Sequence, residues 1–130
     1  AVKMVHGGWD IGTCATPIRT THEAVISSIV KVATHDGRAQ WFSRSAIPHG
    51  GPYLRHLGIY AYSIEALERW HALPQSRNER AENLEQLRAV EAGLNIGVAK
   101  VERSAPGVDT SIDAAEVEWL LTLAGHEAPA

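Results

Sequence analysis

The stretch Y-L-R-H-L-G-I-Y-A-Y, residues 53–62, decides the fold of this chain. Aromatic and branched side chains dominate it, which is typical of a β-strand. From Ser63 onward the apolar residues recur with a period of about 3.6 instead of about 2. This change predicts a helix over residues 64–72, with Ile64, Leu67 and His71 on one face and Pro74 beyond its end. A strand that leads directly into a helix indicates a mixed α/β fold.

The segments on either side of this stretch predict the same fold class. Residues 36 and 37 read Asp-Gly, a strong signal for a β-hairpin, and they join strand-like runs at 29–34 and 39–43. The other expected elements are a strand over 9–18, a short helix from Thr20 toward Ser28, a loop over 48–52, a helix over 78–92 ending at Gly93, a strand over 94–101 and a helix over 110–124. We therefore predict a single α/β domain over residues 1–130, with a mixed sheet, a β-hairpin and three to four helices. The last helix is expected to face inward with Ile112, Trp119, Leu120 and Leu123.

The composition excludes several classes of function. The net charge is -3 and Lys and Arg form no block, so no nucleic-acid partner is expected. No apolar run approaches the ~18 residues of a membrane span, so no membrane partner is expected either. Cys14 is the only cysteine, which excludes an internal disulfide and favours a reduced, cytoplasmic compartment. The histidines are scattered without the spacing of zinc ligands.

Two polar pairs are candidates for ligand binding, and each has a structural alternative. Alternation along the predicted strand puts His56 and Tyr60 on one face, with Gly58 between them, where a ligand or another backbone could approach. The alternative is a histidine satisfied within the core. Glu85 and Gln86 adjoin the apolar stripe of the helix over 78–92, and their alternative is the solvent edge of that helix.

Asp109 stands where a turn enters the last predicted helix. A carboxylate at this place either binds a ligand or caps the helix. Residues 110–113 read Thr-Ser-Ile-Asp, which resembles a capping box and favours the second interpretation.

Several motifs occur in an order that resembles a known family. They are T-C-A-T-P-I at 13–18, W-F-S-R-S-A-I-P at 41–48, the strand at 53–62, L-E-Q-L-R at 84–88 and G-V-D-T at 107–110. Together they resemble the C-terminal half of the CMP-Kdo synthetase (3-deoxy-manno-octulosonate cytidylyltransferase) family. The resemblance implies the C-terminal half of a nucleotide-diphospho-sugar transferase fold. It also implies CTP-dependent activation of the acidic sugar Kdo for lipopolysaccharide synthesis, release of pyrophosphate, a magnesium requirement and a dimer.

The same resemblance implies roles for individual residues. His56, Tyr60, Glu85 and Gln86 match positions that bind the sugar, and Arg44 matches the arginine of the F-S-R motif. Asp109 matches an aspartate that helps to coordinate Mg²⁺. Of these residues, five are expected to converge on one concave site: His56, Tyr60, Glu85, Gln86 and Asp109.

The departures from the family pattern define two interpretations. The glycine-rich turn that cradles phosphates is absent, and the family's S-P-L-E reads Ser-Arg-Asn-Glu at 76–79. In the first interpretation the chain is the sugar-binding and dimerisation half of a cytidylyltransferase, inactive alone, whose nucleotide-binding half either is a separate chain or has been lost. In the second it is a non-catalytic module that oligomerises and holds a small polar ligand. Both predict a homo-oligomer, a dimer above all, in which the region 29–48 takes part.

Overall fold

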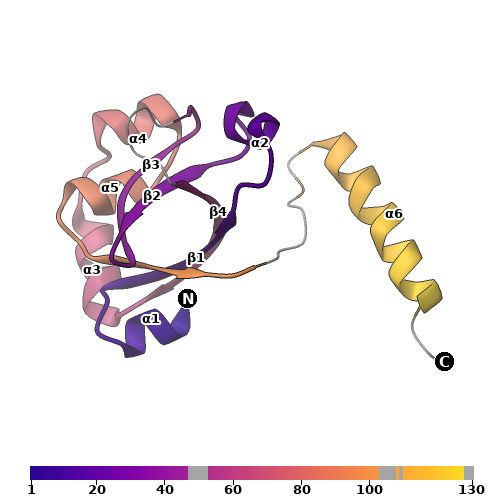
Figure 1. Ribbon diagram of the computed structural model, residues 1–130. Coiled ribbons are helices and arrows are strands. Elements are labelled where there is room, and N and C mark those ends of the chain that lie inside the picture. The colour runs from indigo at the N-terminus through magenta and orange to yellow at the C-terminus, as the bar shows by residue number, and fades with distance from the viewer. Residues whose placement is uncertain (47–52, 103–107, 109, 128–130) are drawn as a thin grey trace.

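The structure is a computed structural model that describes residues 1–46, 53–102, 108 and 110–127. The loop expected at 48–52 and the candidate Asp109 lie outside the described residues. In chain order the elements are α1 (Val2–His6), β1 (Ile11–Pro17), α2 (Thr21–Val25), β2 (Lys31–His35), β3 (Arg38–Ser43), β4 (Tyr53–Tyr62), α3 (Ile64–Ala72), α4 (Arg77–Glu82), α5 (Gln86–Glu91), β5 (Ile96–Lys100) and α6 (Ser111–Glu127) (Figure 1).

The strands form one mixed sheet that closes into a barrel in the order β1-β4-β2-β3-β5 (Figure 1). Strand β4 runs antiparallel to β1 and, through its first residues, to β2. Strands β1 and β5 are parallel, and β3 meets β5 where Arg38 pairs with Gly97. The predicted mixed α/β fold is therefore present. The described part of the chain has six helices, however, which exceeds the three to four expected.

The predicted hairpin joins β2 to β3, as expected from Asp36 and Gly37. Both residues have a positive φ, of 49° and 78°, and His35 pairs with Arg38 across the turn. Two positive φ values in a two-residue loop define a type I′ turn, whose twist matches that of the flanking strands. Aspartate tolerates this conformation and glycine adopts it without steric cost.

The single helix predicted over 78–92 is wrong, because the structure breaks it into α4 and α5. Asn83 ends α4 in the left-handed conformation, with φ of 54° and ψ of 50°. Asparagine adopts this conformation more readily than most residues, so it can stop a helix without a glycine. The chain re-enters helix at Glu85 and stops again next to Gly93, whose φ is 79°. The break lets Leu84 and Leu87 both point into the core.

The core fills the barrel and continues under α3, α4 and α5, which lie along one side of it in Figure 1. Its members are Ile11, Ala15, Val32, Ala39, Phe42, Ala66, Leu84, Leu87, Ala89, Leu94, Ile96 and Val98. Burying one of the larger aliphatic or aromatic side chains stabilises the fold by about 1.5–3 kcal/mol. Helix α3 contributes Ala66 and packs Trp70 against the core, so its Ile64 and Leu67 are left exposed.

The N-terminal segment closes one side of the barrel and was not predicted as a helix. The ring of Trp9 lies so close to Gly97 that a Cβ atom on this residue would be 2.5 Å from the ring. A Cβ atom on Gly12 would lie 2.9 Å from the Cβ atom of Met4 in α1 and closer still to the carbonyl oxygen of Ala1. Glycine is needed at both positions because the neighbouring groups occupy the space of a side chain.

Helix α6 does not bury the residues that were expected to face inward. Ile112 is 79% exposed, Trp119 61% and Leu123 46%, and Figure 1 shows the helix standing away from the barrel. The prediction assumed a partner surface within the chain, and among the described residues no element covers this helix. None of the described helices is long and apolar enough to span a membrane.

Candidate functional site

An irregularity in β4 brings His56 and Tyr60 side by side. Thr13 of β1 pairs with Tyr60 and Cys14 pairs with Leu57, so Gly58 and Ile59 are extra residues that bulge out of the ladder. Four residues of regular strand would separate the two side chains by roughly 13 Å. The ring centroids are instead 5.4 Å apart. This short distance confirms that both residues share one face, and the bulge explains why they lie so close together.

The gap expected at Gly58 is not a space between the two rings. Gly58 and Ile59 are both exposed, and a Cβ atom on Gly58 would meet nothing within 4 Å. The glycine is directed away from the face that carries His56 and Tyr60. A ligand on that face would meet the two rings as neighbours.

Thr13 anchors the bulge and fixes the histidine. Its hydroxyl lies 2.8 Å from the carbonyl oxygen of Ile59, 3.3 Å from that of Leu57, and 2.9 Å from Nε2 of His56. A hydroxyl has one proton, and a carbonyl oxygen can only accept. The arrangement that satisfies these groups has Thr13 donating to the bulge carbonyls and His56 donating from Nε2 to Thr13. Nδ1 of His56 is then the unprotonated nitrogen, an acceptor.

Burial keeps this histidine neutral. It lowers the pKa of His56 to about 4, so the imidazole carries no charge near pH 7. Among the described residues, every buried side-chain nitrogen or oxygen has a hydrogen-bond partner. Nδ1 of His56 forms no hydrogen bond within the described part of the chain, so it has to reach solvent. His56 thus presents a neutral acceptor to whatever occupies the face of β4.

Aromatic rings continue from His56 in a row across β4 and onto α3. The edge of Phe42 lies against His56 with centroids 5.0 Å apart. Tyr60 is 6.1 Å from Tyr62, which is 6.4 Å from Trp70. Tilted and edge-on aromatic pairs at these separations each stabilise by about 0.5–1.5 kcal/mol beyond their burial. The row forms a firm surface along one face of β4.

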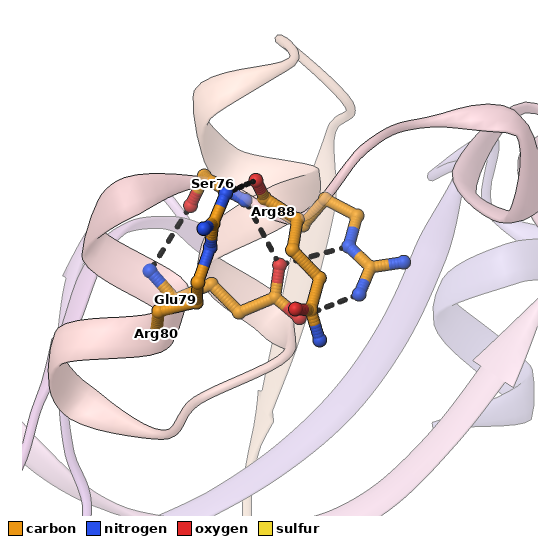
Figure 2. A network of polar contacts seen from close by, with 5 residues as sticks. Ser76, Glu79, Arg80 and Arg88 are labelled. Atoms are coloured by element: carbon orange, nitrogen blue, oxygen red, sulfur yellow. Dashed lines mark hydrogen bonds and ion pairs between the residues drawn. The ribbon is translucent and has the colours of Figure 1, made fainter.

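Arg88 and Glu79 support the end of this row. The guanidinium carbon of Arg88 lies 4.4 Å from the centroid of the Trp70 ring, a cation–π contact. Figure 2 shows its guanidinium meeting the carboxylate of Glu79 through two hydrogen bonds, of 2.9 and 2.5 Å. The same carboxylate accepts from the backbone N–H of Ser76, whose hydroxyl accepts from that of Glu79, which completes a capping box. The hydrogen bond from Arg88 holds the pKa of buried Glu79 below its usual value.

Glu85 and Gln86 are the predicted site residues that lie at the start of helix α5. Glu85 is exposed, and its charge acts on both Tyr60 and Tyr62. Burial, Tyr62 and then Glu85 raise the pKa of Tyr60, so its phenol keeps its proton and can donate. Glu85 therefore lies near enough to Tyr60 for its charge to act there, and Tyr60 in turn adjoins His56. Gln86 follows Glu85 as the first residue of α5 and is half-buried.

The guanidinium of Arg44 forms its hydrogen bonds with backbone carbonyl groups of the same chain. Its Nε donates to the carbonyl of Glu82 at 2.8 Å, and its other nitrogens donate to the carbonyls of Ser27 and Asn83. The carboxylate of Glu82 in turn accepts from Ser43 and from the N–H of Arg44. These bonds hold the turn that leads to Glu85 and Gln86. A direct contact between Arg44 and a sugar stays a prediction.

Lys31 lies fully buried behind this turn. Its ammonium donates to the carbonyls of Ile26 and Arg44, at 2.6 and 2.5 Å. Burial, and after it the charge of Arg44, lowers the pKa of Lys31, while the charge of Glu82 opposes the change. The lysine joins the end of β3 to the segment before β2.

Asp109 lies outside the described residues. The other role considered for this position, capping of the last helix, can be examined in residues 110–113. Thr110 accepts from the N–H of Asp113 at 3.2 Å, and the carboxylate of Asp113 accepts from the N–H of Thr110 at 2.8 Å. The predicted capping box is therefore confirmed, and it does not need Asp109. Among the residues that the structure describes, no three His, Cys, Asp or Glu side chains gather as they would around a metal ion.

Two structural residues of the site were not found from the sequence. Thr13 lies in a buried strand, and nothing in its neighbours indicates that its hydroxyl holds a histidine 43 positions away. Glu79 was read only as part of an altered family motif. The spacing of Ser76 and Glu79, S-x-x-E, is the signature of a capping box and could have identified both residues.

Comparison with known proteins shows which family the chain that carries this site belongs to. A family model described as Cytidylyltransferase matches residues 4–96, which is more than half of the chain. The chain belongs to the cytidylyltransferase family. The matched span of the cytidylyltransferase model includes Thr13, the whole of β4, and Glu79 to Arg88. It therefore contains every described residue of the candidate site.

Relatives within the cytidylyltransferase family share one name. The chain is 44% identical over 133 residues to 3-deoxy-manno-octulosonate cytidylyltransferase of Rhodospirillum centenum, and the match covers 93% of this chain and 52% of that protein. It is 47% identical over 110 residues to the protein of the same name from Rhodopseudomonas palustris, covering 80% and 45%. The chain thus spans about half the length of the curated relatives it matches.

A solved structure supports the same relationship. CMP:2-keto-3-deoxy-manno-octonic acid synthetase, complexed with CTP, matches with a TM-score of 0.80 and 36% sequence identity. The match covers 98% of this chain and 54% of that one. The resemblance to the CMP-Kdo synthetase family is therefore confirmed in both sequence and fold.

Proposed function

We propose that this chain is the sugar-binding half of a cytidylyltransferase that activates 3-deoxy-manno-octulosonate or a similar sugar acid with CTP. The observation that carries the proposal is the face of β4. It presents a neutral acceptor from His56, a protonated phenol from Tyr60 and, beside them, the carboxylate of Glu85. The relatives that share this region are named for their action on that sugar.

A sugar acid with several hydroxyl groups suits this set of polar groups. Nδ1 of His56 accepts a hydrogen bond from one hydroxyl, the phenol of Tyr60 donates to another, and Glu85 accepts from one or two more. The aromatic row provides a firm apolar surface under the carbon skeleton. Neutral His56 cannot pair with the sugar carboxylate, which therefore needs a positive group from elsewhere in the site.

The reaction proposed is transfer of the cytidylyl group to the sugar. The hydroxyl on the anomeric carbon attacks the α-phosphorus of CTP, the bond between the α- and β-phosphates breaks, and pyrophosphate leaves as the hydroxyl loses its proton. The role of this chain is to hold the sugar in one orientation, because positioning supplies much of the rate in such transfers. The CTP-binding part corresponds to the half of the relatives that this chain does not match.

The proposal includes Mg²⁺, for which Asp109 supplies one carboxylate by resemblance to the family. The described residues do not form a magnesium site by themselves. Mg²⁺ prefers a few carboxylates together with phosphate oxygens and water, so the remaining ligands would come from CTP and from the complementary half. A homodimer that involves the region 29–48 is part of the same proposal, as is a separate nucleotide-binding chain.

Binding of the sugar tests this proposal without any catalysis. Titration of the full chain with 3-deoxy-manno-octulosonate, followed by NMR, should shift the ring signals of His56 and Tyr60. Tyr60→Phe and Glu85→Gln should each weaken binding about 10-fold, because each removes a hydrogen bond to a hydroxyl. Glu65→Gln, on the exposed side of α3, is the matched control and should change nothing. Unshifted rings at saturating sugar would refute the proposal.

The second interpretation is a non-catalytic module that oligomerises and holds a small polar ligand. It differs from the first in that no separate nucleotide-binding half would restore turnover. We expect the chain alone to release no pyrophosphate from CTP, Mg²⁺ and the sugar. Release of pyrophosphate by the purified chain would contradict this expectation and the division of labour between halves.

A further inference from the structure

Among the described helices, α6 carries the most exposed large apolar side chains. Ile112, Trp119 and Leu123 follow one line along it, Leu120 lies beside that line, and Leu121 projects from the opposite side. All five are exposed, with Trp119 at 61% and Leu121 at 67%. A helix that is apolar around much of its circumference is normally buried.

The stability of an isolated helix also requires that its apolar side chains be covered. Helix α6 has 17 residues, and most of the stability of a helix in a protein comes from packing of its apolar side chains rather than from helix propensity. The capping box of Thr110 and Asp113 stabilises only its first turn. Within the described part of the chain no element covers Trp119 or its neighbours. The helix is therefore built for a surface that another polypeptide segment supplies.

The comparison with the solved synthetase indicates what that segment is. The match covers 98% of this chain, so the 17 residues of α6 fall within it, but it covers only 54% of the synthetase chain. Almost as much polypeptide again belongs to the synthetase and has no counterpart here. That unmatched polypeptide is therefore the occupant to test for the exposed face of α6.

We propose that α6 is the docking helix for the complementary, CTP-binding half of a cytidylyltransferase. The partner surface would be an apolar groove that takes Trp119 and Leu123. Basic residues would border it at the beginning of the helix, where Asp113, Glu116 and Glu118 lie and where α6 has no Lys or Arg. The identity of the partner rests on the proposed function, whereas the docking surface itself does not depend on sugar binding.

Co-purification tests the docking directly. The tagged full chain would be co-expressed with the part of the Rhodospirillum centenum relative that lies outside the match, and the mass of the complex measured by size-exclusion chromatography with light scattering. We expect a complex that Trp119→Gln combined with Leu123→Gln weakens about 100-fold or more. Ile64→Gln, which is equally exposed and apolar but lies on α3, is the matched control and should leave the complex intact.

The outcomes separate the docking helix from the sugar site. A complex that is lost only with the α6 changes supports the proposal, even if the sugar fails to bind. Absence of a complex, or a complex unaffected by the α6 changes, would overturn it, even if the sugar binds. Self-association of the chain alone that the α6 changes abolish would also overturn it, because a second copy would then be the occupant. Hydrogen exchange over residues 111–127, slower in the complex than in the chain alone, provides an independent measurement.

Discussion

The hydroxyl of Thr13, 2.9 Å from Nε2 of His56, determines which nitrogen of the histidine is left for a ligand. The same hydroxyl serves the carbonyls of the β4 bulge, so the shape of the strand and the tautomer of the ring have one origin. Placing a buried hydroxyl between a histidine and a bulge fixes an acceptor without using a charged group. The nitrogen that His56 offers in the proposed sugar site is therefore linked to the irregular pairing of β1 with β4.

Replacing Thr13 by valine should disturb both features. Valine keeps the shape but leaves the carbonyl of Ile59 without its partner, so the free energy of unfolding should fall by about 1–3 kcal/mol. In the wild-type chain, ¹⁵N NMR should show a proton on Nε2 and none on Nδ1 of His56. In Thr13→Val the two tautomers should mix.

Thr16→Val provides the control for this change. Thr16 is buried on the same strand and donates to the carbonyl of Glu102, away from the site. We expect it to lower stability without changing the His56 spectrum. A wild-type ring protonated on Nδ1 would contradict the hydrogen-bond assignment.

The depressed pKa of His56 should make stability depend on pH. The unfolded histidine takes up a proton near pH 6.5, whereas the folded one does so only near pH 4. Unfolding therefore binds a proton between these values, and stability falls as the pH is lowered from 6.5 to 4, by about 3 kcal/mol in all. Chemical denaturation at a series of pH values should show this slope, and His56→Gln should flatten it. His71→Gln, an exposed substitution on α3, should leave the slope in place.

Breaking the Glu79–Arg88 pair should be costly. Each variant, Glu79→Gln or Arg88→Met, removes one partner of a nearly buried ion pair, and Arg88→Met also removes the contact with Trp70. We expect a loss of about 3–5 kcal/mol in the free energy of unfolding. Arg80→Met, on the same helix as Glu79, is the control. The exposed Arg80 side chain donates to the carbonyl of Gln75 and acts on Glu79 only through its charge, so its loss should cost under about 0.5 kcal/mol. Equal effects of Arg80→Met and Arg88→Met would argue against a special role for the pair.

A methyl group at Gly97 should displace Trp9. The added Cβ atom would lie 2.5 Å from the indole ring, and overpacking of this kind costs about 1–3 kcal/mol. Thermal unfolding should therefore occur at a lower temperature in Gly97→Ala, and the additional change Trp9→Leu should recover part of the loss. Gly58→Ala meets no atom within 4 Å and serves as the control. A neutral Gly97→Ala would mean that the ring moves aside freely.

The sequence was sufficient for the elements that local chemistry determines. Asp36-Gly37 predicted the hairpin, Ser63 predicted the start of α3, and the Thr-Ser-Ile-Asp box predicted the start of α6. Each of these signals acts over a few residues, so it can be read without knowing the fold. The mixed α/β class followed from the change of period at Ser63.

The remaining features depend on contacts between distant segments. The bulge in β4 is fixed by Thr13 from another strand, and the break at Asn83 is held by Arg44, which directly follows β3. No local pattern shows either contact. The inward face assigned to α6 failed for a related reason, because its apolar residues indicate burial without indicating what buries them. The site was reached through motif resemblance. The structure places the rings of His56 and Tyr60 side by side, and the charge of Glu85 acts on Tyr60, whereas the convergence of all the predicted residues stays a prediction.

The seam of the barrel has a consequence for the order in which the fold comes apart. In the part of the chain that the structure describes, β3 and β5 share one pair, Arg38 and Gly97, and the N–H of Val98 reaches the carbonyl of Gly37 at 2.8 Å. Because this ladder is so short, β3 and β5 should be the first neighbouring strands of the barrel to separate, either by thermal fluctuation or under mechanical load. Strand β4 lies opposite this seam, between β1 and β2. The barrel can therefore open and close along one side while the strand that carries His56 and Tyr60 stays paired.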